Sequence, residues 1–231
     1  MITEFSKGST ILVDKPLHWT SFDVVNKIRW CLKQKLNIKK IKVGHAGTLD
    51  PLATGLLVIC IGAHTKRINE LMDGVKVYTG KFLLGKTTPS YDLETEFDGE
   101  FPTAHITDSL IEQVRATFIG ENQQIPPVFS AKKIKGQRAY DLARSGKVVA
   151  LESNQIKINS LAVDAANFPE IGFEVSCSKG TYIRSLASDF GKRLDSGATL
   201  IELRRMGSGE QLLEETKSVL EWIEFIENSP L

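Results

Sequence analysis

Residues 44–55 read Gly-His-Ala-Gly-Thr-Leu-Asp-Pro-Leu-Ala-Thr-Gly, and the longest uninterrupted apolar run of the chain, Leu56–Ile61, follows them directly. Three glycines and one proline predict an irregular backbone, because glycine tolerates left-handed torsion angles and proline disfavours helix at the residue before it. The apolar run predicts a buried strand. Asp50 therefore stands on a constrained loop beside a buried strand, a frequent position for a catalytic acid. The residue types leave open the alternative that Asp50 only caps the turn ahead of Pro51.

Hydrophobic periodicity predicts short strands and helices along the whole chain. Apolar runs or alternation predict strands at 10–13, 56–61, 75–84, 171–177 and 199–203. Spacings of three and four predict helices at 20–36, 65–72, 110–118, 137–145, 183–194 and 218–227, the first capped by Thr20 with Asp23 and the fifth stopped by Gly197. Residues 43–55 and 121–135 are expected to be loops. The sequence therefore predicts a fold that mixes α and β.

The composition is that of a globular protein. Of 231 residues, 42% are apolar and 25% are charged, which excludes disorder, collagen and coiled coil. No repeat or linker divides the chain, so we expect a single domain over residues 1–231. The apolar runs are far shorter than the ~18 residues of a membrane span, and Met1–Ser9 lacks a signal-peptide core, so we expect a cytoplasmic protein without membrane contact. The three cysteines lack metal-ligand spacing and predict no metal site.

Charge is strongly segregated along the chain, although the net charge is only +1. Residues 27–42 contain seven basic and no acidic side chains, and residues 130–147 contain six basic side chains against one aspartate. Acidic residues dominate 92–112 and 208–231. Either block alone is explained by a solvent-exposed helix or loop face. Two basic blocks with interleaved aromatic residues instead favour an anionic polymer as the partner, bound on one basic surface.

A second candidate segment is Lys179–Arg184, at a predicted junction between strand and helix. Arg184 falls in the first helical turn, where the helix dipole favours anions, so we expect it to have an anionic partner. An ordinary surface ion pair, which stabilises little, is the alternative. Tyr78 lies in the middle of a predicted strand, and by itself this position favours a core role over a catalytic one.

Four ordered segments resemble the motifs of the TruB family of tRNA pseudouridine synthases. They are Asp14–Pro16, Gly44–Gly55, Ser178–Arg184 and Leu203–Arg205, and Ile125–Lys132 resembles the family's RNA-gripping insertion, here about 121–152. The resemblance implies the pseudouridine synthase fold, an α+β fold with a central, mostly antiparallel mixed sheet, flanking helices and a catalytic cleft. It also implies isomerisation of uridine 55 in the T arm of tRNA, without a metal or organic cofactor.

The resemblance assigns the chemistry to three residues. Asp50 matches the family nucleophile, which attacks either the ribose or the uracil ring as a carboxylate. Arg184 matches the arginine that pairs with this carboxylate, and an opposite charge keeps a buried acid ionised. Tyr78 matches the tyrosine that stacks on the flipped base and can move a proton.

Further residues are assigned to RNA binding, because reaching a stacked uridine requires base flipping. His45 matches the residue that fills the vacated space, and Tyr182 and Leu203 match residues of the uridine pocket. The remaining assignments are Lys15 and Lys66 for phosphate or loop support, Asp92 for ordering the cleft, and Lys132 and Lys133 for gripping RNA.

One departure from the family pattern is large. Most bacterial members continue after the Leu203–Arg205 segment into a C-terminal PUA domain, whereas only one acidic helix is predicted here, so we expect no PUA domain. Recognition is then expected to rest on the T arm of tRNA, with a monomeric protein and no obligate protein partner. Two other interpretations stay open: a tRNA-binding protein in which catalysis is incidental, and a relative of the guide-RNA-dependent synthases of archaea and eukaryotes.

Neutralising Lys132, Lys133 and Lys135 together is predicted to weaken tRNA binding and to flatten its salt dependence, because fewer counterions are released. Binding measured over a series of salt concentrations tests this. A slope equal to that of the unmodified protein would mean that these lysines belong to a solvated loop.

Overall fold

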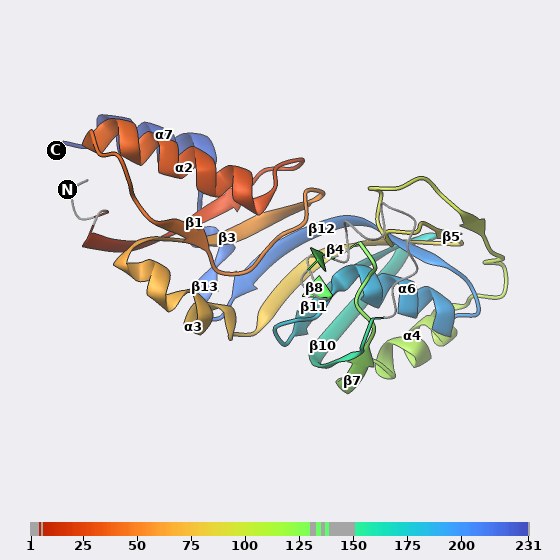
Figure 1. Ribbon diagram of the computed structural model, residues 1–231. Helices are drawn as coiled ribbons and strands as arrows, with labels where there is room; N and C mark the ends of the chain where they lie inside the picture. The colour runs from red at the N-terminus through yellow and green to blue at the C-terminus, as the bar shows by residue number, and fades with distance from the viewer. Residues whose placement is uncertain (1–4, 6, 130–132, 135–136, 139–150, 231) are drawn as a thin grey trace. The chain divides into compact units, whose positions relative to one another are not determined.

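The computed structural model describes residues 5, 7–129, 133–134, 137–138 and 151–230 (Figure 1). The chain forms two compact units, which are described separately. Unit 1 comprises Met1–Tyr78 and Leu203–Leu231, and unit 2 comprises Thr79–Glu202. Strands β4 (Lys76–Leu84) and β12 (Ala198–Ser208) have residues in both units. None of the described helices is long and apolar enough to cross a membrane.

Unit 1 is built on a sheet in the order β14-β1-β3-β12. Strand β1 (Gly8–Lys15) runs antiparallel to β3 (Ala53–Gly62), in a register that pairs Gly8 with Gly62 and Lys15 with Gly55. Strand β12 runs parallel to β3, with Leu203 opposite Ala53. The short strands are β2 (Val43–His45) on β3, β13 (Gln211–Leu212) on β12 and β14 (Lys217–Ser218) on β1.

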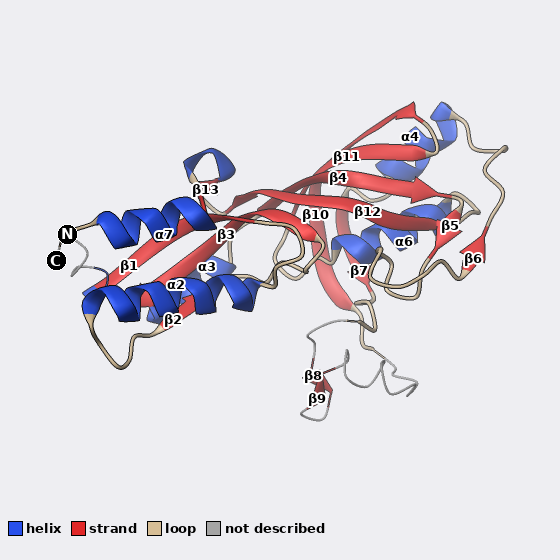
Figure 2. Cartoon of the chain, turned by 90° about the horizontal axis from the view of Figure 1, so that it is seen from above, coloured by secondary structure: helices blue, strands red, loops and turns tan. Residues whose placement is uncertain are grey.

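Helices α2 (Ser21–Leu36) and α7 (Val219–Asn228) lie side by side in unit 1 (Figures 1 and 2). Each begins with a capping box, made by Thr20 with Asp23 and by Ser218 with Glu221. Their apolar faces pack on one face of β1 and β3, in a cluster that includes Val13, Val24, Ile28, Leu57, Ile59, Ile61 and Ile226.

Strand β3 is covered on both faces, which explains its uninterrupted apolar run. Leu57, Ile59 and Ile61 join the helix-covered cluster. Leu56 and Val58 alternate with them and form a second cluster, against which Ile68 and Leu71 of α3 (Ile68–Met72) pack. A 3-10 turn, η1 (Ala63–Arg67), leads into α3, and η2 (Leu213–Glu215) lies between β13 and β14.

The strands of unit 2 follow the order β12-β4-β11-β10-β7. Strand β10 (Asn154–Asn167) pairs antiparallel with β11 (Glu170–Cys177) and with β7 (Gly120–Gln124). Helices α4 (Asp108–Ala116) and α6 (Ile183–Arg193) pack beside each other. Two small ribbons complete the described part, β5 (Lys86–Thr87) with β6 (Gly99–Glu100) and β8 (Lys133–Ile134) with β9 (Gln137–Arg138).

Four phenylalanines form the aromatic core of unit 2. The ring of Phe82 stacks on Phe173 with 4.2 Å between centroids and lies 5.7 Å from Phe190. Phe190 in turn stacks on Phe118. Because these residues come from β4, β11, α6 and the segment after α4, the cluster joins two strands to α6 and to the end of the α4 segment.

The predicted α+β class with a mixed sheet is confirmed, as are the five predicted strands. The helices expected at 20–36, 110–118, 183–194 and 218–227 are confirmed with small shifts at their ends, and the one at 65–72 starts as the 3-10 turn η1. The prediction that Gly197 stops α6 is wrong: the helix ends at Arg193, and Asp195 takes the left-handed conformation with φ 51°.

Both predicted loops are shorter than expected. Residues 43–45 and 53–55 of the glycine-rich segment are strand, because their backbone groups pair in the β2–β3 and β3–β12 ladders. Residues 121–124 of the second segment also belong to a strand, β7, which is polar because it lies at the sheet edge. The helix predicted at 137–145 is wrong at Gln137–Arg138, which pairs with β8, and its remaining residues lie outside the described part.

Replacing Phe82 by alanine is predicted to lower the free energy of unfolding by about 3–5 kcal/mol, because the ring is fully buried and its removal leaves a cavity. Urea unfolding measures this change. Phe97→Ala is the matched control, since that ring is 45% exposed and is contacted by the Lys86 ammonium group. An equal loss in the two variants would contradict the assigned core.

Candidate active site

Asp50 lies in unit 1 on the loop that connects β2 with β3. The neighbouring residue, Leu49, is fixed to the start of α2 through the buried side chain of Ser21. The Ser21 hydroxyl accepts a hydrogen bond from the Leu49 amide (2.8 Å) and donates one to the Leu49 carbonyl (3.1 Å). The main chain beside Asp50 is therefore held by a buried side chain and not only by the turn itself.

Lys15 secures the other side of Asp50. Its ammonium group is fully buried and donates to the carbonyls of Trp19 (2.6 Å), Pro16 (2.8 Å) and Pro51 (3.4 Å). The Pro51 carbonyl also accepts the His18 amide (2.8 Å). Burial lowers the pKa of Lys15 from 10.5 to about 8, and the Asp50 carboxylate is the strongest influence in the opposite direction. Lys15 thus supports the loop, and it lies close enough to Asp50 to interact electrostatically.

A second buried cation, Arg205 of β12, contacts the same loop. Its guanidinium donates to the carbonyl of Leu56 (2.7 Å) through Nε and to that of Gly47 (3.2 Å) through Nη2. The side chain is only 1% exposed. Gly55, with φ 100°, lies against the Arg205 backbone, which a Cβ atom would overlap. The glycine therefore permits the close approach of β3 and β12 that brings Arg205 to the loop.

His45, Leu203 and Tyr78 also belong to unit 1. Burial and the Arg205 charge lower the pKa of His45, partly offset by a hydrogen bond with the Gly47 backbone. A pKa below its usual 6.5 means that His45 presents a neutral imidazole at pH 7. Leu203 is 8% exposed on β12, and Tyr78 is 8% exposed on β4. Tyr78 is therefore largely buried in the structure, and the catalytic role that the resemblance implies for it stays a prediction.

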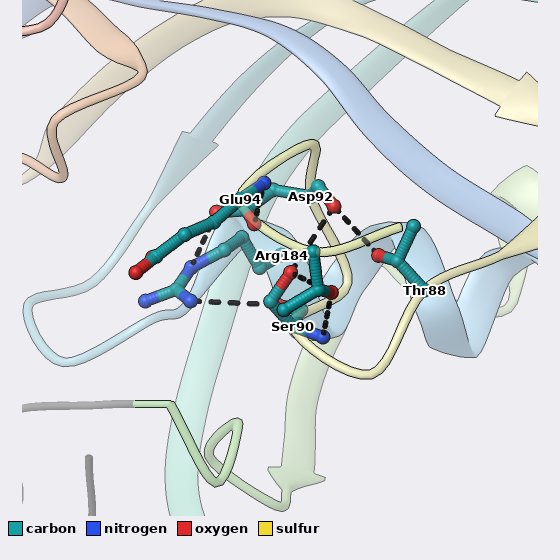
Figure 3. A network of polar contacts seen from close by, with 6 residues as sticks. Thr88, Ser90, Asp92, Glu94 and Arg184 are labelled. Atoms are coloured by element: carbon teal, nitrogen blue, oxygen red, sulfur yellow. Dashed lines mark hydrogen bonds and ion pairs between the residues drawn. The ribbon is translucent and has the colours of Figure 1, made fainter. Parts of the chain in front are cut away.

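Arg184 lies in unit 2, at the start of α6, and forms a buried polar network with the segment 88–94 (Figure 3). Its Nε lies 3.5 Å from Asp92 Oδ2, and its Nη1 donates to the Ser90 carbonyl (3.4 Å). Both partners of the ion pair are 4% exposed. The expected anionic partner is therefore present, and it is buried, which excludes the alternative of a surface ion pair.

The Asp92 main chain and side chain are both held within this network. The hydroxyls of Thr88 (2.6 Å) and Ser90 (3.1 Å) donate to the Asp92 carbonyl, and the Glu94 amide donates to Asp92 Oδ1 (3.0 Å). One oxygen of the Asp92 carboxylate thus accepts the Glu94 amide, while the other faces Arg184. The pairing of Arg184 with Asp50 that the resemblance implies stays a prediction.

Tyr182 is fixed by a residue that the sequence did not single out, Gln124. The Tyr182 amide donates to Gln124 Oε1 (2.8 Å), and Gln124 Nε2 donates to the Tyr182 carbonyl (3.1 Å). Lys66 is exposed on η1. Lys132 lies outside the described residues, and Lys133 belongs to β8 without a described side chain.

Comparison with known proteins supports the family resemblance of the motif that contains Asp50. A family model described as TruB family pseudouridylate synthase, N-terminal domain, matches residues 33–183. The chain belongs to the TruB family of pseudouridylate synthases. The tRNA pseudouridine synthase B of Parabacteroides distasonis is 53% identical over 226 residues, which cover 98% of this chain and 96% of that protein. The tRNA pseudouridine synthase B of Flavobacterium johnsoniae is also 53% identical, over 90% of this chain and 91% of that protein.

This TruB family member is also similar in fold to solved structures. A chain in the crystal structure of a Cbf5-Nop10-Gar1 complex is 27% identical, with a TM-score of 0.71. A chain of an H/ACA RNP bound to a substrate RNA containing 2′-deoxyuridine is 25% identical, with a TM-score of 0.68. Each match covers 97% of this chain and little more than half of the other, 56% and 55% respectively. The fold is thus the pseudouridine synthase fold.

Three residues that sequence reasoning missed support the TruB family motifs. Ser21 and Gln124 act through backbone groups, and Arg205 was included in a recognised segment without a role. A polar side chain that satisfies a carbonyl far away in the sequence leaves no local pattern, so only the structure identifies these residues. Within the described residues, no group of three or more histidine, cysteine, aspartate and glutamate side chains is placed to hold a metal ion.

The buried Lys15 predicts a specific dependence of stability on pH. The unfolded lysine keeps its proton up to about pH 10.5, whereas the folded one loses it near pH 8, so its contribution to stability rises between these values. The free energy of unfolding should therefore increase with pH, relative to that of Lys15→Met, by up to about 3 kcal/mol over this window.

Urea unfolding of both proteins at pH 7, 8, 9 and 10 measures this difference. Lys39→Met, which removes an exposed charge, is the control. A difference between wild type and Lys15→Met that stays constant with pH would show that Lys15 titrates normally in the folded protein.

Proposed function

We propose that this TruB family member is a tRNA pseudouridine 55 synthase that uses Asp50 as its nucleophile. The observation that carries the proposal is the position of Asp50. The acid stands within the family motif on a loop that Ser21, Lys15 and Arg205 hold through its main chain. Hydrogen bonds to the neighbouring main chain fix the point at which the Asp50 side chain leaves the loop before substrate arrives, and such pre-organisation favours nucleophilic catalysis. The relatives named tRNA pseudouridine synthase B support the choice of substrate.

The reaction is an isomerisation and needs no external oxidant or reductant. The bond between C1′ of the ribose and N1 of uracil breaks, the base is repositioned, and a bond between C1′ and C5 forms. C5 then loses its proton, and N1 takes one up. Asp50 attacks as a carboxylate, either on the ribose or on the uracil ring, and is released at the end. Lys15 supplies a nearby positive charge that favours the ionised form of Asp50.

The other assignments follow from the family and from the local geometry of each residue. Arg184 keeps Asp50 ionised, and Asp92 orients the Arg184 guanidinium through their buried ion pair. Tyr78 stacks on the flipped uracil and can move a proton. His45 enters the space that the base leaves, and its neutral ring suits a place between stacked bases better than a charged one.

The pocket and the basic segments complete the proposal. Tyr182 and Leu203 line the uridine pocket, and Lys66, Lys132 and Lys133 bind RNA phosphates. The substrate element is the T arm, recognised by shape and by its splayed loop bases. A monomeric protein, a cytoplasmic location and the extent of the single catalytic domain remain predictions.

Asp50→Asn is expected to bind tRNA with unchanged affinity and to form no detectable pseudouridine, because the amide is not a nucleophile. Binding is measured by filter retention, and pseudouridine by release of tritium from tRNA labelled at C5 of uridine. Asp195→Asn is the matched control, since Asp195 is exposed and asparagine tolerates its left-handed backbone. Product formation by Asp50→Asn at the normal rate would exclude this nucleophile.

The Asp50→Asn variant also separates the two alternatives, when tRNA folding is measured beside pseudouridine formation. A binding protein with incidental catalysis would change tRNA folding equally well with aspartate or asparagine at position 50, so it predicts no functional loss in the Asp50→Asn variant. A guide-dependent relative would be inactive on tRNA alone. Activity of the purified chain on bare transcript excludes the guide-dependent relative. A change in tRNA folding that the wild type produces and Asp50→Asn does not would exclude the binding protein.

A further inference from the structure

The first turn of helix α6 lacks a local cap. Tyr182 is the N-cap residue, and its side chain makes no capping hydrogen bond. The first turn contains no acidic residue and instead carries Arg184, whose charge is unfavourable at the positive end of the helix dipole. Main-chain amides at a helix start need acceptors, which a capping side chain usually supplies. Residues from elsewhere in the chain must therefore fix the point at which α6 begins.

Gln124, the last residue of β7, makes the missing contacts. Its Oε1 accepts the Tyr182 amide (2.8 Å), and its Nε2 donates to the Tyr182 carbonyl (3.1 Å). In a capping box, a glutamate or glutamine at the third helical position accepts the amide of the N-cap residue. Ser185 occupies that position in α6. Gln124 thus takes the part of the capping residue from 58 positions away in the chain.

Ser185 makes the reciprocal contact. Its hydroxyl donates to the carbonyl of Ile125 (2.7 Å). The side chains of Gln124 and Ser185 are buried, at 3% and 1% exposed, so water does not readily replace the hydrogen bonds that they make. Three hydrogen bonds therefore join residues 124 and 125 to the main chain and side chain on either side of Arg184.

The segment that holds α6 is itself rigid. Gln124 pairs with Asn154 in the ladder between β7 and β10. Ile125 precedes Pro126, which restricts its backbone to extended conformations, and Pro126 and Pro127 are buried. The start of α6 is therefore attached to a fixed part of the sheet.

Arg184 is sensitive to the position of this helix start. Its Nε lies 3.5 Å from Asp92 Oδ2, and its Nη1 lies 3.4 Å from the Ser90 carbonyl oxygen (Figure 3). Both distances exceed the ~2.7–2.9 Å of a strong charge-assisted hydrogen bond. A displacement of the helix start by about 1 Å away from Asp92 would break both contacts. The hydrogen bonds of Gln124 and Ser185 thus decide whether the Arg184 guanidinium keeps its orientation.

We propose that Gln124 and Ser185 are positioning residues of the synthase, which place Tyr182 and Arg184 by fixing the start of α6. The proposal rests on the proposed function for the roles of Tyr182 and Arg184 in the reaction. Misplacement of groups near the reacting atoms lowers the rate steeply, whereas the affinity for tRNA is dominated by phosphate contacts. The effect of Gln124 is therefore on the rate of the bound complex and not on binding.

The test replaces Gln124 by methionine, which has the same length and lacks the amide. Gln123→Met is the matched control, since Gln123 is the exposed neighbour on β7 and accepts a hydrogen bond from Ser153 (3.0 Å). Pseudouridine formation is followed in single turnover, with protein at saturating excess over a tRNA transcript labelled with tritium at C5 of uridine. Filter retention measures the affinity for the same transcript.

Gln124→Met is expected to lower the single-turnover rate constant by about 10- to 100-fold, while the affinity for tRNA changes by less than about 3-fold. The control should change neither quantity. A protein that is only less stable contains fewer folded molecules, but its bound complex reacts with the normal rate constant. A normal rate constant in Gln124→Met would therefore overturn the proposal, as would a loss of affinity equal to the loss of rate.

Ser185→Ala tests the reciprocal contact separately. It removes one of the three hydrogen bonds, so the rate constant is expected to fall by about 3- to 10-fold. Ser188→Ala, which removes another buried hydroxyl of α6, is the control and should leave the rate constant unchanged. Equal rate constants in the two serine variants would exclude Ser185 as a positioning residue.

Hydrogen exchange of peptides from residues 178–188 provides a readout that needs no activity. Exchange there should be faster in Gln124→Met than in Gln123→Met, and exchange in β1 and β3 should be equal in the two variants. If the wild type forms no pseudouridine but this difference is found, the proposed function fails and the attachment of α6 to Gln124 stands. If the wild type is active and neither rate nor exchange differs between the variants, the positioning role fails and the proposed function stands.

Discussion

The buried guanidinium of Arg205 is the constraint on which the arrangement around Asp50 depends. It satisfies main-chain carbonyls on both sides of the loop, at Gly47 and Leu56. Taking a charge out of water costs several kcal/mol unless hydrogen bonds compensate it. Such a group stays buried only where the surrounding backbone is fixed, so Arg205 and the loop geometry require each other. The buried ammonium group of Lys15 is compensated in the same way, by hydrogen bonds to three main-chain carbonyls.

Unit 2 uses a buried charge differently. Arg184 faces a carboxylate, Asp92, and that carboxylate is itself oriented by the Glu94 amide. A carbonyl offers only a partial charge, whereas a carboxylate offsets part of the positive charge, so Arg184 acts on a second carboxylate only at short range. Unit 1 thus holds buried cations that support a loop, and unit 2 holds an arginine whose direction is set by its partner carboxylate.

Much of the fold could be predicted from the sequence where local chemistry decides it. Thr20 with Asp23 marks the start of α2, and the run Leu56–Ile61 marks the most buried strand. Strand β10 was missed because register shifts after Ile158 and Asp164 interrupt its alternation. Strand β7 was missed because its five residues are polar apart from one glycine, so pairing with β10 and not side-chain burial defines it.

The candidate site, like the fold, could be predicted only where a local residue pattern marks it. Asp50, Arg184 and Tyr78 stand in segments with recognisable residue patterns, whereas the partners that hold them do not. Asp92 lies far before Arg184 in the chain, and Arg205 meets Gly47 across 158 positions, through contacts that only the folded chain creates. Hydrogen bonds to backbone carbonyls are invisible in a sequence, because every residue offers one.

Unit 1 is built from two separate parts of the chain, Met1–Tyr78 and Leu203–Leu231, and this affects the order in which the two units can fold during synthesis. Strand β1 lies between β3 and β14, and Trp222 of α7 donates to the Leu12 carbonyl of β1 (2.8 Å). Unit 2 is contiguous and is fully synthesised by residue 202, whereas unit 1 waits for residues 203–231 to leave the ribosome. Domains fold as they emerge, N-terminal parts first, but here the N-terminal strands must wait for residues 203–231. Arg205 belongs to that segment, so the nascent chain acquires its ordered Asp50 loop only after unit 2 has been synthesised.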